Sequence, residues 1–285
     1  MSSPPADLFF SKKTMPELPE VETTRRGIEP HVRGVKITEV IVRRRDLRQQ
    51  ISADLSTIEG QRITGVDRRS KYLLLAIDDR STILIHLGMS GSLRVISHAD
   101  PWKTHDHVGI TLANGKQLRF HDPRRFGLVL RLTGDPMSHP LLRKLGPEPL
   151  EECFTAAHLQ AACTNRSAAI KLVIMDAKVV VGVGNIYASE ALFRAGILPH
   201  SPAKKLTKPR LAKLVTAIRA VLTDAIQEGG TTLRDFLHSN SEPGYFKQRL
   251  FVYERKDQPC RICDTPIRHA VIGQRSTYWC PKCQK

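Results

Sequence analysis

The sequence has few acidic residues for its basic ones, few aromatic residues and no long apolar run. Its 285 residues include 28 acidic and 44 basic side chains, a formal charge of +16, and aromatic residues make up 6%. No run is apolar enough to span a bilayer, and Leu8-Phe9-Phe10 is too short for the core of a signal peptide. These absences favour a cytoplasmic protein that binds a polyanion, either nucleic acid or an anionic membrane surface. Composition alone leaves open a protein with a merely solvated cationic surface.

Cysteine is also scarce, and four of the six cysteines form two pairs near the C-terminus. Sixteen residues separate Cys260-x-x-Cys263 from Cys280-x-x-Cys283. This spacing is typical of a tetrahedral zinc site with four thiolate ligands. Two disulfides are the alternative, and they would need an oxidising compartment that the sequence does not signal. The remaining two, Cys153 and Cys163, are expected to be semi-buried thiols.

Between about residues 30 and 135 the sequence predicts strands. The runs "KYLLLAI", "STILIHLG" and "GITLANGKQLRF" are short and β-rich, and Asn114-Gly115 in the third predicts a hairpin. "DPRRFGLVLRL" resumes a strand after a proline turn. Strands without helices between them predict an antiparallel sandwich or barrel rather than a parallel sheet.

After Gly146-Pro147-Glu148-Pro149 the composition favours helices. "TAAHLQAAC" and "AAIKLVIMD" suit helices, and "NIYASEALFRAGI" predicts one that is capped by Asn185 and ends at Gly196. A longer helix over "KPRLAKLVTAIRAVLTDAIQEGG" is expected to stop at Gly229-Gly230. The predicted fold class is therefore α+β, with a β domain, a helical domain and a zinc module.

Three loops hold candidate functional residues. "VVVGVGNIYASE" lacks the third glycine of a dinucleotide fingerprint, because Tyr187 occupies that position, but its glycine turn could hold a phosphate beside Asn185. An ordinary turn between helices is the alternative. "HDPRRFG" and "HLGMSGS" combine arginine, an aromatic ring and a methionine, which favours DNA that is bent and opened. "RRSKYLLL" places Lys71 at the start of a strand, where a solvated lysine is the plain alternative.

Ten motifs follow one another from Met15 to Lys285: "MPELPEVETTRRGIEPH", "RRSKYLLL", "HLGMSGSLR", "HDHV", "DPRRFG", "LGPEPL", "VVGVGNIYASEALF", "GGTTLRDF", "PGYF" and the four-cysteine module. In this order they resemble the formamidopyrimidine-DNA glycosylase family, and only residues 1–14 lie outside the resemblance. It implies an N-terminal antiparallel β-sandwich over 16–146, a helical domain with a helix–two-turn–helix element over 150–240, and a zinc finger over 250–285. It also implies a monomer with one structural Zn²⁺ that binds double-stranded DNA containing oxidised purines, on the nucleoid of a bacterial cytoplasm.

The resemblance implies a bifunctional DNA glycosylase and AP lyase of base excision repair, which excises 8-oxoguanine and formamidopyrimidines. The family's nucleophile is an N-terminal proline that attacks the sugar C1′, and here it corresponds to Pro16. A terminal amine titrates near neutrality, unlike a lysine near ~10, so it can be unprotonated in the cell. Glu17 corresponds to the adjacent acid/base, Lys71 to the lysine that assists β-elimination, and Arg275 to the arginine linked to δ-elimination.

Further positions correspond to DNA contacts in the family. Met89, Arg124 and Phe126 match the residues that fill the gap left by a flipped nucleotide. Before "AAIK" the family often has a lysine cluster, whereas this chain has "TNRS" with Arg166 as its only cation. The full set of expected DNA contacts is His86, Met89, His105, Arg124, Arg125, Phe126, Arg166, Asn185 and Tyr245.

The stretch "MPELPEVETTRRG" raises a question about the first residues. Pro19 suits the first turn of a helix, with Leu18, Val21 and Ile28 on one face. If Met15 precedes Pro16 in the mature protein, the proline nitrogen is a tertiary amide and cannot form a Schiff base. We therefore expect residues 1–15 to be absent from the active enzyme. Two alternatives remain: an endonuclease VIII-like glycosylase for oxidised pyrimidines, and a catalytically silent DNA-binding zinc-finger protein that retains residues 1–14.

Overall fold

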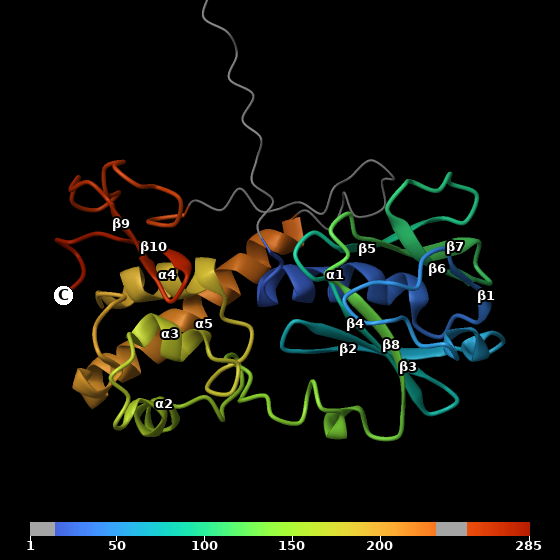
Figure 1. Cartoon of the computed structure of the whole chain (residues 1–285), viewed down its shortest axis with the longest axis horizontal. Coiled ribbons are helices and arrows are strands. Elements are labelled where there is room, and N and C mark those ends of the chain that lie inside the picture. Colours follow the sequence, from blue (N-terminus) through green and yellow to red (C-terminus); the bar gives the residue numbers. More distant parts are fainter. Residues whose placement is uncertain (1–14, 232–249) are drawn as a thin grey trace, which may run out of the picture.

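A computed structural model of the chain describes residues 15–231 and 250–285. These residues form a β half and a helical half, with a small C-terminal hairpin beside the helices (Figure 1). Two long segments cross between the halves. They are helix α1 at the start of the described chain and the connection that follows the last strand of the β half.

The β half is a sandwich of two antiparallel four-stranded sheets, ordered β1-β6-β7-β5 and β2-β3-β4-β8. Its core lies between the sheets and contains the inward-facing aliphatic side chains of both. At Asn114-Gly115 the chain turns from β6 into β7, and Gly115 has the positive φ of 76° that such a turn requires. The strands are β1 (Ile37–Val42), β2 (Ile63–Arg69), β3 (Tyr72–Ile77), β4 (Ser81–His86), β5 (Ser92–Ser97), β6 (Asp106–Leu112), β7 (Lys116–His121) and β8 (Leu128–Thr133), with the short 3₁₀ helices η1 (Leu55–Ile58) and η2 (Pro136–Ser138) in connections.

Helix α1 (Leu18–Val32) joins the two halves. Val21 and Ile28, two of the three apolar residues predicted to share a face, are buried in the core of the sandwich together with Val32. The third, Leu18, is buried but lies outside that core. Another side of α1 contacts helix α5. Pro19 lies in its first turn, where a missing N–H costs no helical hydrogen bond. The residues just before α1 are thereby held at the junction of the halves.

The helical half is built around α4 and α5, and its core is separate from that of the sandwich. Helix α4 ends at Gly196 with a φ of 69°, as predicted. Two boundaries differ from prediction: Gly184 rather than Asn185 is the N-cap of α4, and α5 continues through Gly229 and Gly230. The elements are α2 (Ala156–Cys163), α3 (Ile170–Met175), α4 (Asn185–Ala195), η3 (Ala203–Lys205) and α5 (Lys208–Thr231).

The C-terminal module is the hairpin of β9 (Arg268–Ile272) and β10 (Arg275–Trp279) with the two cysteine pairs at its base. Glu190 of α4 fixes the segment that leads into it, because its carboxylate accepts hydrogen bonds from the backbone N–H groups of Phe251, Val252 and Tyr253, each at 2.9 Å. The predicted sandwich, helical region and four-cysteine module are thus confirmed. In the described parts of the chain, no helix has the length and apolar character needed to cross a membrane.

Candidate active site

Glu17 lies at the N-terminus of helix α4, although more than 160 residues separate the two in the sequence. Its carboxylate accepts hydrogen bonds from the backbone N–H groups of Gly184 (2.8 Å) and Ile186 (3.1 Å). Burial raises the pKa of Glu17, while the charge of Lys71 and the backbone donors act in the opposite direction. A carboxyl group next to Pro16 is therefore held in place and can be protonated at a higher pH than a solvated glutamate.

This contact corrects one expectation from the glycine turn. The N–H groups of Gly184 and Ile186 bind the chain's own carboxylate, so they are not free to hold a phosphate. Glycine at position 184 leaves room for this contact, because a Cβ there would lie 2.1 Å from the carboxyl carbon of Glu17 and would displace the side chain. The turn is a docking point for the start of α1.

A second carboxyl group lies beside the first. Glu20 accepts a hydrogen bond from the backbone N–H of Glu17 (2.8 Å) and one from the hydroxyl of Tyr187 (2.5 Å). Burial, together with the nearby charge of Glu17, raises the pKa of Glu20 to about 7. Two carboxyl groups so close together disfavour the doubly ionised state, so at least one tends to hold a proton near neutral pH.

Lys71 lies in the turn between β2 and β3, and its charge influences both Glu17 and His86. The turn is fixed by Glu148, whose carboxylate accepts hydrogen bonds from the N–H of Ser70 (2.7 Å) and from the guanidinium of Arg68 (2.7 Å). Ser70 has a φ of 57°, an uncommon value outside glycine that this hydrogen bond helps to stabilise. The structure therefore places Lys71 near enough to Glu17 for its charge to act on that carboxyl group.

Met89, Arg124 and Phe126 lie on two loops that contact each other. A Cβ on Gly88 would lie 2.5 Å from the backbone nitrogen of Gly127, so the loops approach as closely as glycine permits. The Arg124 guanidinium is 5.1 Å from the centre of the Phe126 ring, and Phe126 is exposed. The predicted trio is thus brought together.

Buried Asp122 ties these loops to each other. Its carboxylate accepts hydrogen bonds from the Ser90 hydroxyl and the Gly127 N–H, both at 2.8 Å. The Ser90 hydroxyl in turn accepts a hydrogen bond from the N–H of Arg124 at 3.1 Å.

The two predicted histidines differ in environment. His86 ends β4, its ring lies 4.8 Å from that of Tyr72, and its Nδ1 accepts a hydrogen bond from the N–H of Gly88. Burial, followed by the charges of Arg48 and Lys71, lowers the pKa of His86 to about 4, so its ring is neutral near pH 7. His105 is exposed, with its ring 5.9 Å from that of His121.

Asn185 and Arg275 meet at the hairpin of the C-terminal module. The Asn185 amide donates a hydrogen bond to the carbonyl of Ser276 (3.0 Å) and accepts one from the ammonium of Lys171 (2.6 Å). Lys171 is fully buried, donates also to the Thr277 hydroxyl (2.7 Å), and has a pKa lowered to about 7 chiefly by burial. Arg275 begins β10 and is exposed. This network fixes the hairpin against α3 and α4.

Two further residues, Arg166 and Tyr245, were predicted to contact DNA. Arg166 is exposed, and its guanidinium is 3.4 Å from the carboxylate of Asp176. Tyr245 lies outside the described residues. The expectation for the two remaining cysteines was wrong, because Cys153 is exposed and Cys163 is buried.

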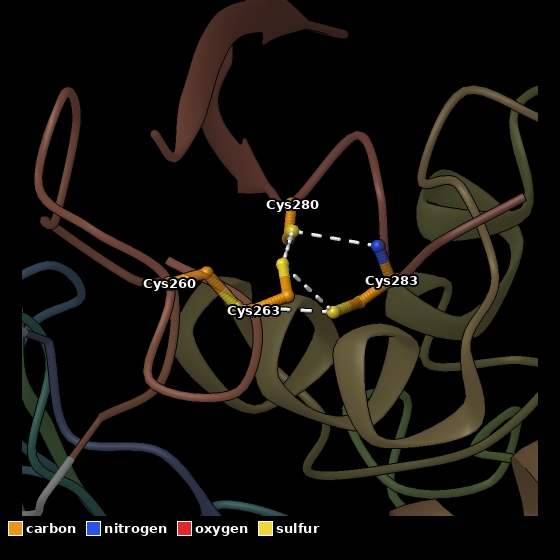
Figure 2. A group of neighbouring side chains, drawn as sticks. All are labelled: Cys260, Cys263, Cys280 and Cys283. Atoms are coloured by element: carbon orange, nitrogen blue, oxygen red, sulfur yellow. Dashed lines mark hydrogen bonds between the residues drawn. The ribbon is translucent and has the colours of Figure 1, made fainter. Parts of the chain in front are cut away.

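The four paired cysteines point their sulfur atoms toward one another (Figure 2). All four sulfur atoms lie within 4.8 Å of one another, and Cys263 Sγ is 3.5 Å from Cys280 Sγ and 3.4 Å from Cys283 Sγ. A tetrahedral zinc ion with Zn–S bonds of about 2.3 Å would separate its sulfur ligands by about 3.8 Å. Since a disulfide needs about 2.05 Å, the arrangement fits zinc and excludes the disulfide alternative.

Comparison with protein families assigns each part of this architecture. The formamidopyrimidine-DNA glycosylase N-terminal domain matches residues 15–129, the formamidopyrimidine-DNA glycosylase H2TH domain matches 145–237, and the zinc finger found in FPG and IleRS matches 257–285. The chain belongs to the formamidopyrimidine-DNA glycosylase family.

Relatives in this family match nearly the whole chain. Formamidopyrimidine-DNA glycosylase of Methylococcus capsulatus is 54% identical over 272 residues, which are 95% of this chain and 100% of the relative. That of Pseudomonas aeruginosa is 52% identical over the same shares.

Solved structures of two proteins have folds similar to that of this chain. The MutM (Fpg) protein of Thermus thermophilus is 40% identical, with a TM-score of 0.81 over 94% of this chain and 98% of that protein. Lactococcus lactis Fpg in complex with DNA containing an abasic site is 30% identical, with a TM-score of 0.85 over 95% of this chain and 100% of that protein.

Four residues of this formamidopyrimidine-DNA glycosylase family member were missed by sequence reasoning. Each supports a predicted residue: Tyr187 contacts Glu20, Glu148 fixes the turn of Lys71, Asp122 joins two loops, and Lys171 fixes the hairpin. Lys171 alone had a visible signal, as a lysine in the apolar run "AAIKLVI". The others are polar residues in turns or on a helix, where the sequence does not reveal a distant partner.

Proposed function

We propose that this chain is a bifunctional DNA glycosylase and AP lyase of base excision repair that excises oxidised purines from double-stranded DNA. Relatives more than half identical to it are named formamidopyrimidine-DNA glycosylase, and a Lactococcus lactis relative is described in complex with Fapy-dG-containing DNA. The observation that carries the proposal is the buried carboxyl group of Glu17 beside Pro16, within the electrostatic influence of Lys71. The family assignment does not favour the endonuclease VIII alternative, which would act on pyrimidines.

In the proposed reaction, the amine of Pro16 attacks C1′ of a nucleotide flipped out of the duplex. The bond from C1′ to the base breaks, and the base leaves with a proton. Glu17 supplies the proton transfer at this step, either to the sugar or to the base. Its raised pKa supports the role, because a larger fraction of the carboxyl group is protonated near neutral pH.

The sugar ring then opens: the C1′–O4′ bond breaks, O4′ takes a proton, and the nitrogen lone pair of Pro16 forms an iminium with C1′. Strand cleavage follows from this iminium. Loss of a proton from C2′ expels the 3′ phosphate by β-elimination, and a second elimination expels the 5′ phosphate. We assign assistance of the first elimination to Lys71 and assistance of the second to Arg275, which is exposed at the start of β10.

The remaining assignments concern DNA. Exposed Phe126, with Arg124 over its ring and Met89 on the adjoining loop, is suited to fill the space of a flipped nucleotide. The zinc module presents Arg275 to the backbone. The other proposed DNA contacts are His86, His105, Arg125, Arg166, Asn185 and Tyr245. We further propose a monomer that acts on chromosomal DNA in the cytoplasm, with functional parts over residues 16–146, 150–240 and 250–285.

The active form is proposed to begin at Pro16. In the 285-residue chain, Met15 acylates the proline nitrogen, which then has neither a free lone pair nor an N–H. The match to the family's N-terminal domain starts at residue 15, which fits a catalytic unit that begins there. Residues 1–15 would have to be removed, or not translated, for the chemistry to occur.

Covalent trapping tests the proposed function. A chain that starts at Pro16 is mixed with duplex DNA containing 8-oxoguanine in the presence of borohydride, which reduces the iminium to a stable amine. We expect a covalent protein–DNA product from this chain and none from the intact 285-residue chain.

Mass spectrometry before and after the reaction verifies both chains, and binding of each to the same duplex is measured as the control. Equal trapping of an intact full-length chain would show that Pro16 is not the nucleophile. Absence of trapping by both chains, with binding retained, would indicate the catalytically silent alternative.

A further inference from the structure

Tyr187 of helix α4 contacts both carboxyl groups of the candidate active site. Its side chain is 1% exposed and packs in the core of the helical half. Its backbone N–H lies 3.5 Å from Glu17 Oε2, and its hydroxyl donates to Glu20 Oε1 at 2.5 Å. A buried tyrosine hydroxyl usually has a hydrogen-bond partner, and here that partner is an acid beside the proposed nucleophile. Tyr187 therefore joins the helical half to both acids.

Both oxygens of the Glu20 carboxyl group accept a hydrogen bond. Oε1 accepts from the Tyr187 hydroxyl, and Oε2 accepts from the backbone N–H of Glu17 at 2.8 Å. A carboxylate can only accept, so a hydroxyl that faces it is the donor. These two donors favour the carboxylate form of Glu20 and act against burial, which raises its pKa to about 7.

Charged groups on other elements act on Glu17. Lys71 in the β2–β3 turn favours its carboxylate form, and the charge of Glu17 in turn acts on Lys171 of α3. Tyr253, in the segment that leads into the C-terminal module, also lies within the electrostatic influence of Glu17. For Glu20, the neighbouring charge is that of Glu17 itself. The hydroxyl from α4 thus acts on the balance between the two acids from the side of Glu20.

We propose that Tyr187 is a positioning residue that directs the proton shared by Glu17 and Glu20 to Glu17. The hydroxyl favours the carboxylate form of Glu20, and two acids so close together disfavour the doubly ionised state, so the proton is left on Glu17. Glu17 is then protonated when Pro16 attacks the sugar, as excision requires. Without the hydroxyl, Glu20 competes more strongly for the proton, and Glu17 loses it at a lower pH. The assignment rests on the proposed function, because it takes Glu17 as the acid of the reaction.

The pH profile of base excision tests this role. Single-turnover excision of 8-oxoguanine is measured between about pH 5.5 and pH 9 for the chain that starts at Pro16 and for its Tyr187→Phe variant. We expect the alkaline limb of the profile to move to lower pH by about one unit, the effect of one lost hydrogen bond to a charged group. On that limb, excision at a fixed pH should be about tenfold slower, and on the plateau it should stay within about twofold of the parent.

Glu20→Gln tests whether Tyr187 acts through Glu20. Glutamine is neutral, like the protonated acid, so this variant should also move the alkaline limb to lower pH. The double variant Tyr187→Phe/Glu20→Gln should have the same limb as Glu20→Gln, because the hydroxyl no longer has a carboxylate to act on. A further shift in the double variant would overturn the proposal. If Tyr187→Phe does not fold, an unchanged limb in Glu20→Gln overturns it equally.

Thr24→Val is the matched control. The Thr24 hydroxyl donates to the backbone carbonyl of Glu20 at 2.9 Å, and valine has nearly the same shape as threonine. This variant also loses a hydrogen bond to Glu20, but not one to its carboxylate, so its alkaline limb should match that of the parent. Thermal unfolding of each variant measures lost stability separately. A limb in Tyr187→Phe equal to that of Thr24→Val would leave Tyr187 with a structural role alone.

Titration of the carboxyl groups by NMR gives a readout that does not need the reaction. Glutamate side chains are labelled with carbon-13 at Cδ, and Glu17→Gln and Glu20→Gln assign the two resonances. We expect Tyr187→Phe to raise the pH at which Glu20 titrates and to lower that of Glu17. Unchanged titration of both groups would overturn the proposal. Failure of covalent trapping with these shifts present would refute the proposed reaction but not the effect of Tyr187 on the proton, so the two failures are distinguishable.

Discussion

Glu17, the N-cap of α1, and Glu20, in its first turn, are two carboxyl groups to which the structure gives different sets of donors. Glu17 receives backbone N–H groups at the positive end of α4, which favours its charged form against the cost of burial. Glu20 receives the Tyr187 hydroxyl and lies close to the charge of Glu17, and its pKa is raised to about 7. The pair can therefore hold one proton near neutral pH, which suits an acid/base site beside Pro16.

The raised pKa of Glu20 predicts a pH dependence of stability. A carboxyl group with a raised pKa in the folded state stabilises the fold most below about pH 4.5, and this stabilisation is lost as pH rises through about 7. Glutamine resembles the protonated acid in shape. Relative to Glu20→Gln, the parent should lose about 2 kcal/mol of unfolding free energy between pH 5 and pH 8. This is less than the free energy that corresponds to the whole pKa shift, because the side chain is partly exposed.

Urea unfolding at a series of pH values measures this difference. Glu39→Gln is the matched control, because Glu39 is an exposed glutamate of β1, and its difference from the parent should not vary with pH. A constant difference between the parent and Glu20→Gln across the range would mean that Glu20 is ionised throughout.

Gly184 is the residue on which the contact between α1 and α4 depends. In Gly184→Ala the new Cβ would meet the carboxyl group of Glu17 at 2.1 Å, so Glu17 must move away from its backbone donors. We expect a loss of about 2 kcal/mol of stability and a fall in base excision of about 100-fold or more. Single-turnover excision of 8-oxoguanine and thermal unfolding measure the two effects.

Gly65→Ala provides the comparison for this variant. A Cβ at Gly65 would lie 4.0 Å from the Cβ of Ala76, which is an ordinary contact, so excision should stay near that of the parent. If Gly184→Ala excised the base as fast as Gly65→Ala, the position of the Glu17 carboxyl group would not matter for the reaction.

At the scale of elements, Glu148 connects three segments that are distant in sequence. Arg68 pairs with both Glu148 (2.7 Å) and Glu22 of α1 (3.0 Å), and Arg69 pairs with Glu148 at 2.8 Å. The connection between the two halves, the β2–β3 turn and α1 are thereby held as a unit. Because the turn contains Lys71 and α1 follows Glu17, this unit sets their separation.

Removal of Glu148 should therefore affect both stability and catalysis. In Glu148→Leu, two largely buried arginines and the N–H of Ser70 lose their acceptor, and we expect a loss of about 3 kcal/mol of unfolding free energy. Strand cleavage should fall more than base excision, because the turn of Lys71 is released. Product ratios on 8-oxoguanine DNA and urea unfolding measure these changes.

Glu151→Gln is the control for this prediction, since Glu151 is an exposed neighbour in the same connection. It should change stability by less than about 0.5 kcal/mol. An unchanged ratio of strand cleavage to base excision in Glu148→Leu would contradict a positioning role for Glu148 and leave only a structural one.

The elements show what the sequence could predict and what it could not. Alternating strands, the Asn114-Gly115 turn and the end of α4 at Gly196 follow local rules, and all were found. The role of Gly184 as the N-cap of α4 was missed because its N–H donates to the carboxylate of Glu17, which is distant in the sequence. For the same reason the sequence does not reveal the partners of Glu148, or those of Lys171 despite its place in an apolar run: each satisfies buried partners that are distant along the chain. Family resemblance supplied Pro16 and Lys71, whereas spacing alone supplied the four cysteines.

At the scale of the whole molecule, two large cores and a small module meet around the start of α1. The module is anchored twice: Glu190 fixes its entry segment, and Lys171 and Asn185 fix its hairpin through Ser276 and Thr277. Its core is small and includes a residue of α4: Phe193 packs with Val252 and Ile267 around two of the cysteines. A module of this size depends on its metal for folding.

Loss of zinc should therefore remove DNA binding while the sandwich stays folded. Without the metal, the β9–β10 hairpin loses its base, and the contact proposed between Arg275 and the DNA backbone would be lost. We expect Cys260→Ser, or removal of zinc with a chelator, to weaken binding of duplex DNA at least ~10-fold. Metal content by atomic absorption, DNA affinity, and circular dichroism of the β structure are measured on the same samples.

Cys153→Ser is the matched control, because Cys153 is an exposed thiol outside the metal site. It should keep one zinc ion per chain and the affinity of the parent. Unchanged DNA affinity in a Cys260→Ser protein shown to be free of zinc would mean that the module does not contribute to DNA binding. The proposed role of Arg275 in the second elimination would then also fail. That role requires the hairpin, which Lys171 and Asn185 hold against the helical half, to bring Arg275 to the DNA.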